Sequence, residues 1–272
     1  MALASVAKAV QRIEERIRAR ERSNVDKVEE IRRNPMLLMT AGGITPDPWQ
    51  QGLLDVDAER ILILASRQAG KSSVSAALAM KAALLVPDSP VLLLSPSQRQ
   101  SGELFRKVLD LYADLGKPVP AVRETAAQLE LANGSRVLSL PGTEGTVRGF
   151  SRVSLLIIDE AARICDALYY AVRPMLAVSQ GRLVALSTPF GQRGWFFDEW
   201  SGEGAWERVR ITADQVPRIT PEFLADERRA LGDRWYSQEY FCSFESSIDA
   251  VFDYQDIQAA LSNDVEPLFS NG

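Results

Sequence analysis

The chain has 272 residues, of which 46% are hydrophobic, and it carries a formal net charge of −5 at pH 7. This length and apolar content allow one large core, so one sizeable main domain is expected. Because histidine is absent, catalytic triads, general bases and metal sites that need histidine are excluded. The negative charge argues against a domain that coats itself with nucleic acid, so any DNA contact should be local or shared among subunits.

The sequence contains no apolar run of the roughly eighteen residues that a membrane span needs, and no apolar signal core at its N-terminus. We therefore expect no membrane partner and an intracellular protein. The two cysteines, Cys165 and Cys242, stand far apart without a nearby partner. A disulfide framework or a zinc site is not expected, and both residues are interpreted as ordinary buried thiols.

The N-terminal stretch, residues 5–34, is rich in Arg, Lys and Glu and contains pairs such as Glu14 and Arg18 at four-residue spacing. This pattern predicts an exposed helix, whose thin apolar stripe cannot hold a core by itself. We expect residues 1–40 to form a helical arm, which is either solvated or packed on a neighbouring subunit.

The main domain is expected over residues 41–250. Short apolar runs alternate there with helical patterns, as a mostly parallel sheet covered by helices requires. The runs are residues 61–65, 91–95, 155–158 and 183–187. Asn133-Gly134 lies between two further strand patterns and predicts a β-hairpin insertion, because both residues tolerate positive φ. After Pro189 we expect helices near 194–200 and 221–231, and no second set of alternating strands.

A phosphate-binding loop is the strongest chemical signal. It follows the first apolar run and precedes a helix-compatible stretch, and its residues are Ser66, Arg67, Gln68, Ala69, Gly70, Lys71, Ser72 and Ser73. Backbone N–H groups of such a loop surround phosphate oxygens, Lys71 supplies a positive charge to the β- and γ-phosphates, and Ser72 places its hydroxyl on Mg²⁺. Ala65 replaces the first glycine of the full GxxxxGK[ST] pattern, so the motif alone does not distinguish a phosphate-binding loop from a chance turn. The strand pattern before it and the helix pattern after it favour the phosphate-binding loop.

Two adjacent carboxylates, Asp159 and Glu160, end the third apolar run. Ligands of open α/β sheets collect at this carboxyl edge. Asp159 is suited to holding hydrated Mg²⁺, and Glu160 to orienting and polarising the water that attacks the γ-phosphate. The alternative is an Asp-Glu pair that caps the following helix, and both roles can coexist.

These motifs together resemble a family, the large terminase subunits that package DNA in tailed double-stranded DNA viruses. The Arg-Gln-x-Gly-Lys-Ser loop looks like the variant Walker A motif of that family. Trp49 and Gln50 resemble its upstream adenine-recognition element, in which a glutamine amide pairs with the base. Ser187 and Thr188 resemble its coupling motif, which links hydrolysis to movement by sensing the γ-phosphate. The resemblance covers roughly residues 45–255.

The resemblance implies a RecA-like (ASCE) P-loop NTPase that hydrolyses ATP with Mg²⁺ and moves double-stranded DNA into a procapsid. It also implies a homo-oligomeric ring, a portal protein and a small terminase subunit as partners, and a location in the host cytoplasm with transient attachment to the procapsid. An arginine finger is expected, with Arg148 as the candidate and Arg152 as its nearest rival, while Arg67 is placed to serve the γ-phosphate in cis.

The sequence departs from the family at its C-terminus. A complete large terminase carries a second, nuclease domain, for which residues 251–272 are too few. We interpret these residues as a linker or tail, expect no nuclease activity, and leave open whether the chain is truncated or a separately encoded ATPase half.

Two other functions remain open at this stage. A superfamily-2 helicase-like or repair ATPase shares these motifs but needs a second RecA-like domain, which does not fit after residue 190. A non-hydrolysing nucleotide-binding module needs Asp159 but has no use for the water-polarising acid Glu160.

Overall fold

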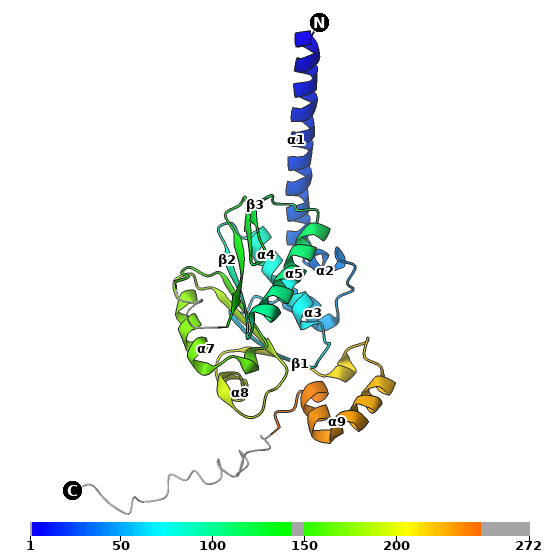
Figure 1. The fold of residues 1–272 in the computed structure, drawn as a ribbon, viewed down its shortest axis with the longest axis vertical. Helices are drawn as coiled ribbons and strands as arrows, with labels where there is room; N and C mark the ends of the chain where they lie inside the picture. The colour runs from blue at the N-terminus through cyan, green and yellow to red at the C-terminus, as the bar shows by residue number, and fades with distance from the viewer. Residues whose placement is uncertain (1, 143–148, 246–272) are drawn as a thin grey trace, which may run out of the picture.

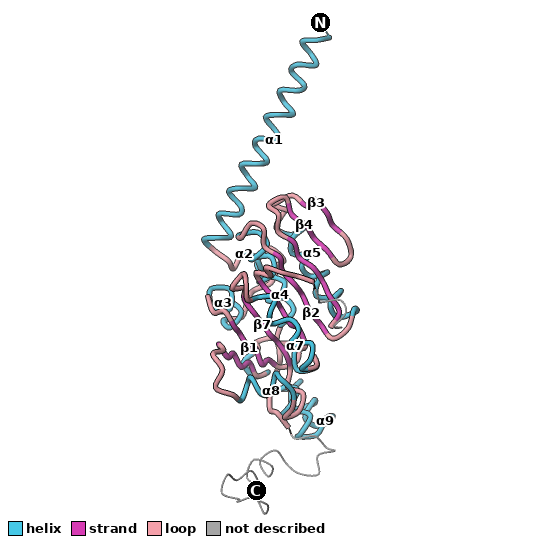
Figure 2. Tube along the Cα trace, turned by 90° about the vertical axis from the view of Figure 1, so that its left-hand side faces the viewer, coloured by secondary structure: helices cyan, strands magenta, loops and turns pink. Residues whose placement is uncertain are grey.

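A computed structural model of the chain describes residues 2–142 and 149–245. The candidate finger Arg148 and the expected tail, residues 251–272, lie outside the described residues. In the described part, a helical arm extends from a body built around one twisted sheet (Figures 1 and 2).

The sheet has eight strands within the described residues, in the order β3-β4-β5-β2-β6-β7-β1-β8. The strands are β1 (Arg60–Ala65), β2 (Pro90–Ser95), β3 (Ala121–Glu124), β4 (Gln128–Leu131), β5 (Arg136–Pro141), β6 (Leu155–Asp159), β7 (Arg182–Ser187) and β8 (Glu207–Ile211). The six strands from β5 to β8 pair in parallel, and β3 and β4 extend one edge antiparallel. The predicted mostly parallel α/β sheet is confirmed.

Continuous apolar strands form the centre of the sheet because both of its faces are covered. Successive β1 residues alternate between two cores: Ile61 and Ile63 face one, and Leu62 and Leu64 face the other. Helices α3, α4 and α5 lie over the first face, and α7 and α8 over the second (Figure 1).

The helical elements are α1 (Ala2–Arg33), α2 (Leu37–Thr40), α3 (Pro48–Asp55), α4 (Lys71–Leu85), α5 (Gln98–Asp114), η1 (Ala161–Arg163), α7 (Asp166–Val172), η2 (Arg173–Leu176), α8 (Gly194–Ser201), η3 (Ala213–Gln215) and α9 (Pro221–Phe241). Figure 2 shows α1 as the arm, and it joins the body where Ile31 is fully buried. Ile13 and Val25 remain exposed on it, so a solvated arm and an arm for a neighbouring subunit both stay open.

Three details of the sequence-based prediction need correction. The strand β8 was not expected, because its Glu-Arg-Val-Arg-Ile sequence lacks an apolar run. The predicted helix over 221–231 is present and is interrupted at Gly232, with φ of 74°, but a second helical segment that the sequence did not indicate continues to Phe241. Cys242 is buried as predicted, but Cys165 is exposed, because it lies at the start of the short surface helix α7.

The predicted hairpin is present, with Leu131 N donating to Ser135 O across the turn. Only Gly134 of the central pair has positive φ, 83°. No helix in the described ranges combines the length and the apolar character that a membrane span needs.

Candidate functional site

The phosphate-binding loop connects the end of β1 to the first turn of α4. Gln68 and Gly70 adopt left-handed conformations, with φ of 60° and 92°, which turn the loop backbone into a concave anion-binding shape. The rear of the loop is fixed to distant elements, since Ser66 N donates to Ile211 O at 2.9 Å and Arg67 N donates to Glu239 O at 3.0 Å. The loop is therefore held in shape by β8 and α9.

Lys71 is the first residue of α4 and is buried at 9% exposure. Its Nζ donates to Ala65 O at 3.1 Å and Ser66 O at 2.9 Å. Burial lowers the pKa of Lys71, an effect that Glu160 and Asp159 oppose. A buried cation at the positive end of a helix dipole is unfavourable unless an anion binds beside it. The position of Lys71 thus indicates an anion site.

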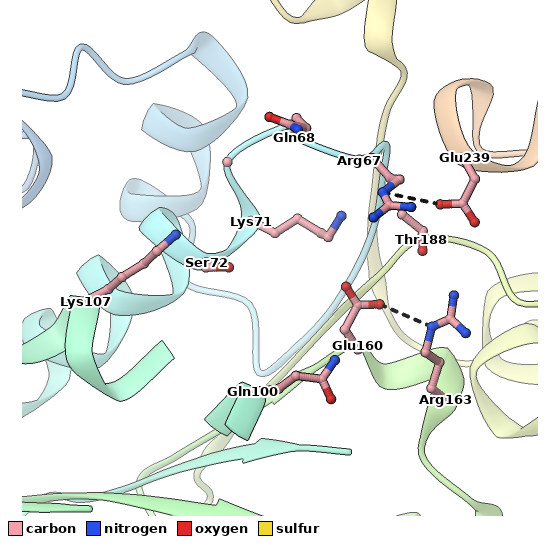
Figure 3. Close-up of a pocket in the computed structure, with 11 residues that line it drawn as sticks. Arg67, Gln68, Lys71, Ser72, Gln100, Lys107, Glu160, Arg163, Thr188 and Glu239 are labelled. Carbon is pink, nitrogen blue, oxygen red and sulfur yellow. Dashed lines mark ion pairs between the residues drawn. The ribbon is translucent and has the colours of Figure 1, made fainter. Parts of the chain in front are cut away.

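A cleft of about 530 Å³ opens in front of this loop. Figure 3 shows side chains from the loop, α5, the end of β6, the end of β7 and α9 arranged around it. The residues that line it are Arg67, Gln68, Gly70, Lys71, Ser72, Gln100, Lys107, Glu160, Arg163, Thr188 and Glu239. Four of these are Lys or Arg, and two are Glu, so the cleft suits a polyanion with a cation.

Asp159 is the last residue of β6 and is buried at 8% exposure. Burial, reinforced by the neighbouring charge of Glu160, raises the pKa of Asp159 to about 6. Lys71, Lys107 and a hydrogen bond from Glu160 N at 3.1 Å to Asp159 Oδ1 act in the opposite direction. A carboxylate that is costly to ionise in this position gains most from a bound cation.

Glu160 adopts a left-handed conformation, with φ of 51°, and heads η1 without a side-chain capping bond. The capping alternative therefore does not account for this residue. Its Oε2 lies 3.7 Å from Arg163 Nε instead, and its side chain points into the cleft (Figure 3). A non-glycine residue with positive φ at a strand end is often kept for function.

The residues fit a magnesium ion. Mg²⁺ prefers oxygen ligands and usually keeps several waters, so two protein oxygens are enough to hold it. The Ser72 hydroxyl and the Asp159 carboxylate supply that chemistry. Within the described residues, no group of three or more Cys, Asp or Glu side chains forms another metal cluster.

Ser187 is the last residue of β7, and Thr188 follows it, next to the end of β6 that carries Asp159. Ser187 is fully buried, and its Oγ accepts a hydrogen bond from Ala162 N at 3.2 Å. Thr188 lines the cleft. The end of β7 is thus tied to the turn that carries Glu160, which gives the predicted coupling pair a physical connection to the site.

Trp49 and Gln50 are not brought to the cleft. Gln50 is 1% exposed, its Oε1 accepts from Asp47 N at 2.9 Å, and its Nε2 donates to Gly70 O at 3.3 Å. Trp49 packs against the core. Both ends of the Gln50 amide thus brace the phosphate-binding loop, and its contact with an adenine stays a prediction that would require these bonds to be exchanged.

Other predicted loop residues divide between the cleft and its surroundings. Ala69 is fully buried in the core, and Ser73 does not line the cleft. Arg67 lines the cleft, and its Nε lies 3.9 Å from Glu239 Oε2. Arg152 is exposed and is not among the lining residues.

Four lining residues were missed by the sequence analysis: Gln100, Lys107, Arg163 and Glu239. The position of α5 directly after β2 signals the first two, because that connection opens at the same sheet edge as the loop. Glu239 gives no local signal, since it reaches the cleft from the second segment of α9.

Comparisons with known proteins agree with this geometry. A family model described as "Terminase large subunit, T4likevirus-type, N-terminal" matches residues 62–259. The chain is 25% identical over 229 residues to the large terminase subunit of Escherichia phage T5, covering 79% of this chain and 52% of that protein. The chain therefore spans about half the length of the curated relatives it matches.

Solved structures show the same fold. The large terminase ATPase domain of Thermus Phage P74-26 superposes with a TM-score of 0.67 at 21% identity, covering 77% of this chain and 96% of that one. The large terminase of another thermophilic bacteriophage, solved in complex with ADP, gives a TM-score of 0.57 at 14% identity, covering 78% of this chain and 52% of that one.

Proposed function

Since the chain belongs to the T4likevirus-type terminase large subunits and matches their N-terminal family model, we propose that it is an ATP-hydrolysing motor domain that drives double-stranded viral DNA into a procapsid. The resemblance that the sequence suggested is confirmed, and so is the P-loop NTPase fold. One observation carries the proposal: Lys71, Glu160 and Thr188 converge on one cleft from the segments that follow three parallel strands, β1, β6 and β7.

ATP supplies the polyanion that the cleft suits. In our proposal Lys71 exchanges its bonds to the Ala65 and Ser66 carbonyls for bonds to the β- and γ-phosphates. Ser72 and Asp159 hold the magnesium ion, which neutralises charge on the phosphates when bound. One relative from a thermophilic bacteriophage was solved with ADP, which supports nucleotide binding in this fold.

Glu160 acts on the attacking water in this mechanism. Its carboxylate orients the water and accepts a proton from it as the water oxygen bonds to the γ-phosphorus and the bond between that phosphorus and the departing ADP oxygen breaks. The ion pair with Arg163 holds the carboxylate at the cleft wall beforehand. Thr188 lines the cleft and senses the γ-phosphate. The hydrogen bond from Ala162 N to Ser187 joins the end of β7 to the turn that carries Glu160, so a change at the γ-phosphate is transmitted to β7.

The wider assembly is also a proposal. We assign the helical arm to residues 1–40 and the motor domain to residues 41–250, with residues 251–272 as a linker or tail. The active form is a homo-oligomeric ring that works with a portal protein and a small terminase subunit in the host cytoplasm. DNA is gripped through phosphate contacts without sequence readout. The absence of nuclease activity stays a prediction, which incubation with plasmid DNA and Mg²⁺ tests.

ATP turnover with and without Mg²⁺ and double-stranded DNA tests the function. We expect Mg²⁺-dependent, DNA-stimulated hydrolysis that falls by at least about 100-fold in Lys71→Ala, because the phosphates lose their fixed charge. Lys117→Ala is the matched control, since that lysine is exposed and paired with Glu124 at 3.0 Å. Binding of ATP without DNA-stimulated turnover in any assembled state would contradict the motor function.

The arginine finger is tested by complementation. Arg148→Ala and Glu160→Gln are each expected to be inactive, and their mixture to recover activity if Arg148 acts on a neighbour's nucleotide. Turnover per wild-type subunit then rises with protein concentration. A mixture that stays inactive, with constant turnover per subunit, would instead assign the finger in cis, where Arg67 is the candidate.

A further inference from the structure

The arm α1 projects from the body as a long single helix (Figures 1 and 2). It is anchored near its C-terminal end, where Ile31 is fully buried and Asn24 and Val28 are half-buried. Farther out, residues 11–16 are all exposed, and 56% of the Ile13 side chain is open to solvent. Because helices in proteins are stabilised mainly by the packing of an apolar face, the outer half of α1 lacks the contacts that usually hold a helix.

The outer half of the arm carries a seven-residue repeat in its sequence. Leu3, Val6, Val10, Ile13 and Ile17 follow one another at alternating spacings of three and four residues. In a helix this spacing keeps the five positions along one side, as positions a and d of a coiled coil. We call these five residues the arm seam.

The same repeat also identifies the side of α1 that packs on the body. Continued toward the C-terminus, the repeat assigns Ile31 to position a, and Ile31 is fully buried. Between the arm seam and Ile31, the a and d positions carry Arg20, Asn24 and Lys27. The apolar part of this side is therefore confined to residues 3–17, where α1 has left the body (Figure 2).

We propose that residues 3–17 form an association element, which packs in parallel against the same segment of a second copy of this chain. The arm seam is complementary to itself, because an apolar stripe matches an identical stripe. The flanking charges agree with this pairing. Arg16 occupies position g and Glu21 occupies position e of the next heptad, and these two positions face each other across parallel helices.

The composition of the arm seam also indicates how many arms can join. Four of its five residues are the β-branched Val or Ile, at both a and d positions. This composition favours bundles of more than two helices. A bundle of several arms is therefore compatible with an assembly of several subunits.

A nucleic-acid partner fits this segment less well. The exposed residues 11–16 carry two arginines and two glutamates, so they have no net positive charge with which to attract phosphates. The phosphate backbone of DNA also offers no apolar surface to Ile13. A second copy of the arm satisfies both the apolar stripe and the mixed charges.

The inference extends the proposed ring and is tested separately from it. Subunits related by rotation about a ring axis carry arms of the same polarity, so parallel pairing agrees with a ring. Association of the full chain is measured by sedimentation equilibrium without nucleotide or DNA, whereas ATP turnover reports on the cleft. Either the arm or the ATPase assignment can therefore fail alone.

Ile13→Glu places a carboxylate in the arm seam and should weaken self-association by at least about tenfold. Ala19→Glu is the matched control, because it adds the same charge to α1 at an exposed position outside the arm seam. This control should associate as the wild type does. Circular dichroism shows whether both variants keep the helix, which glutamate favours.

An exchange of charges tests whether two arms contact each other. Arg16→Glu should weaken association by about threefold, because it brings like charges together across the pair. Adding Glu21→Arg should restore the wild-type association. If the arm instead bound DNA or the body of a neighbour, the second change would not compensate the first.

Cysteine cross-linking tests the parallel polarity. Ile13→Cys and Ala19→Cys are compared in a Cys165→Ser background, in which the remaining native thiol, Cys242, is buried. Parallel pairing in register brings the d positions of two arms together. Mild oxidation should therefore link copies through position 13 at least about tenfold faster than through position 19.

Four results would overturn the proposal. The wild type would remain monomeric at every concentration measured, or Ile13→Glu would associate as the wild type does. Alternatively, the double charge exchange would stay as weak as Arg16→Glu, or positions 13 and 19 would cross-link at equal rates.

Discussion

Asp159 and Lys71 are both buried beside the cleft, and burial disfavours the charged form of each. The attraction between the two charges offsets the cost of burying them only in part, because Lys71 donates its hydrogen bonds to backbone carbonyls and not to Asp159. Glu160 adds a second negative charge next to Asp159. Such a set of charges is poorly satisfied until phosphates and a divalent cation arrive together. The buried charges of the cleft therefore destabilise the ligand-free protein.

Asp159→Asn is expected to stabilise the metal-free protein above pH 6. The pKa of Asp159 rises from 3.8 in its ordinary state to about 6 on folding. The folded state therefore holds the proton more tightly, and this contribution is full below about pH 4 and is lost as the pH rises through about 6. This difference of about two between the unfolded and folded pKa of Asp159 corresponds to on the order of 3 kcal/mol of folding free energy.

Urea unfolding in EDTA measures this effect at pH 5 and pH 7.5. The variant should gain stability relative to the wild type between these two values, because its amide does not titrate. Equal pH dependence in both proteins would show that Asp159 titrates normally.

The two cysteines should differ strongly in reactivity. Burial raises the pKa of Cys242 to about 12, and its Sγ donates to Ile211 O at 3.2 Å. Cys165 is exposed. Because the thiolate is the nucleophile, iodoacetamide at pH 8 should label Cys165 at least about 100-fold faster, as mass spectrometry of timed samples would show. Cys165→Ser should resist labelling until urea is added; comparable rates in the native wild type would contradict the burial of Cys242.

At the scale of elements, the phosphate-binding loop is clamped between α3 and the segment before α9. Arg218 donates two bonds to Asp47, at 2.8 and 2.9 Å, and one to Ala69 O at 3.4 Å. Gln50 contacts the loop from α3, and a Cβ on Gly70 would lie 2.7 Å from its Nε2. Gly70, at positive φ, is thus required for both the turn and this close approach.

Arg218→Ala should lower the free energy of unfolding by about 1–2 kcal/mol, because it leaves the carboxylate of Asp47 buried and without its ion pair. The half-exposed guanidinium keeps the effect below that of a fully buried pair. Arg218→Lys should be intermediate, since an ammonium cannot form the paired bonds.

Chemical unfolding compares these variants with Arg229→Ala, which removes an exposed ion pair to Asp226 on α9 and should change stability by less than about 0.5 kcal/mol. If the Arg218→Ala variant were as stable as this control, the bonds of Arg218 to Asp47 and to the phosphate-binding loop would not stabilise the protein.

The predictability of each element follows from how local its signal is. The strands β1, β2, β6 and β7 are continuous apolar runs, so their positions, and with them the Walker motifs at their ends, could be read from the sequence. The strand β8 could not, because among the described strands it pairs with β1 alone, at the edge of the sheet. Its Arg208 side chain donates to the backbone carbonyls of Glu199 and Trp200 on α8 instead of entering the core. Glu239 and Arg218 act through tertiary contacts that no local pattern encodes.

At the scale of the whole molecule, the cleft lies at the carboxyl ends of the parallel strands β1, β6 and β7. The helix α1 extends away from the body (Figure 1). Exposed apolar side chains on the arm, Ile13 and Val25, and on α9, Trp235, leave surface for neighbours. A ring would place such surfaces between subunits and bring an arginine to the neighbour's cleft, which is the arrangement that the complementation experiment examines.

Single-turnover hydrolysis by Glu160→Gln tests the central claim most directly, because this change removes the proton acceptor and keeps the shape of the cleft. The variant should bind Mg²⁺-ATP within about threefold of the wild type and cleave it about 10²–10⁴-fold more slowly, so that labelled ATP is recovered intact from the complex. A variant that cleaves ATP at the wild-type rate, or a wild type that returns bound ATP unhydrolysed, would contradict the assignment of Glu160 and of the cleft as an ATPase site.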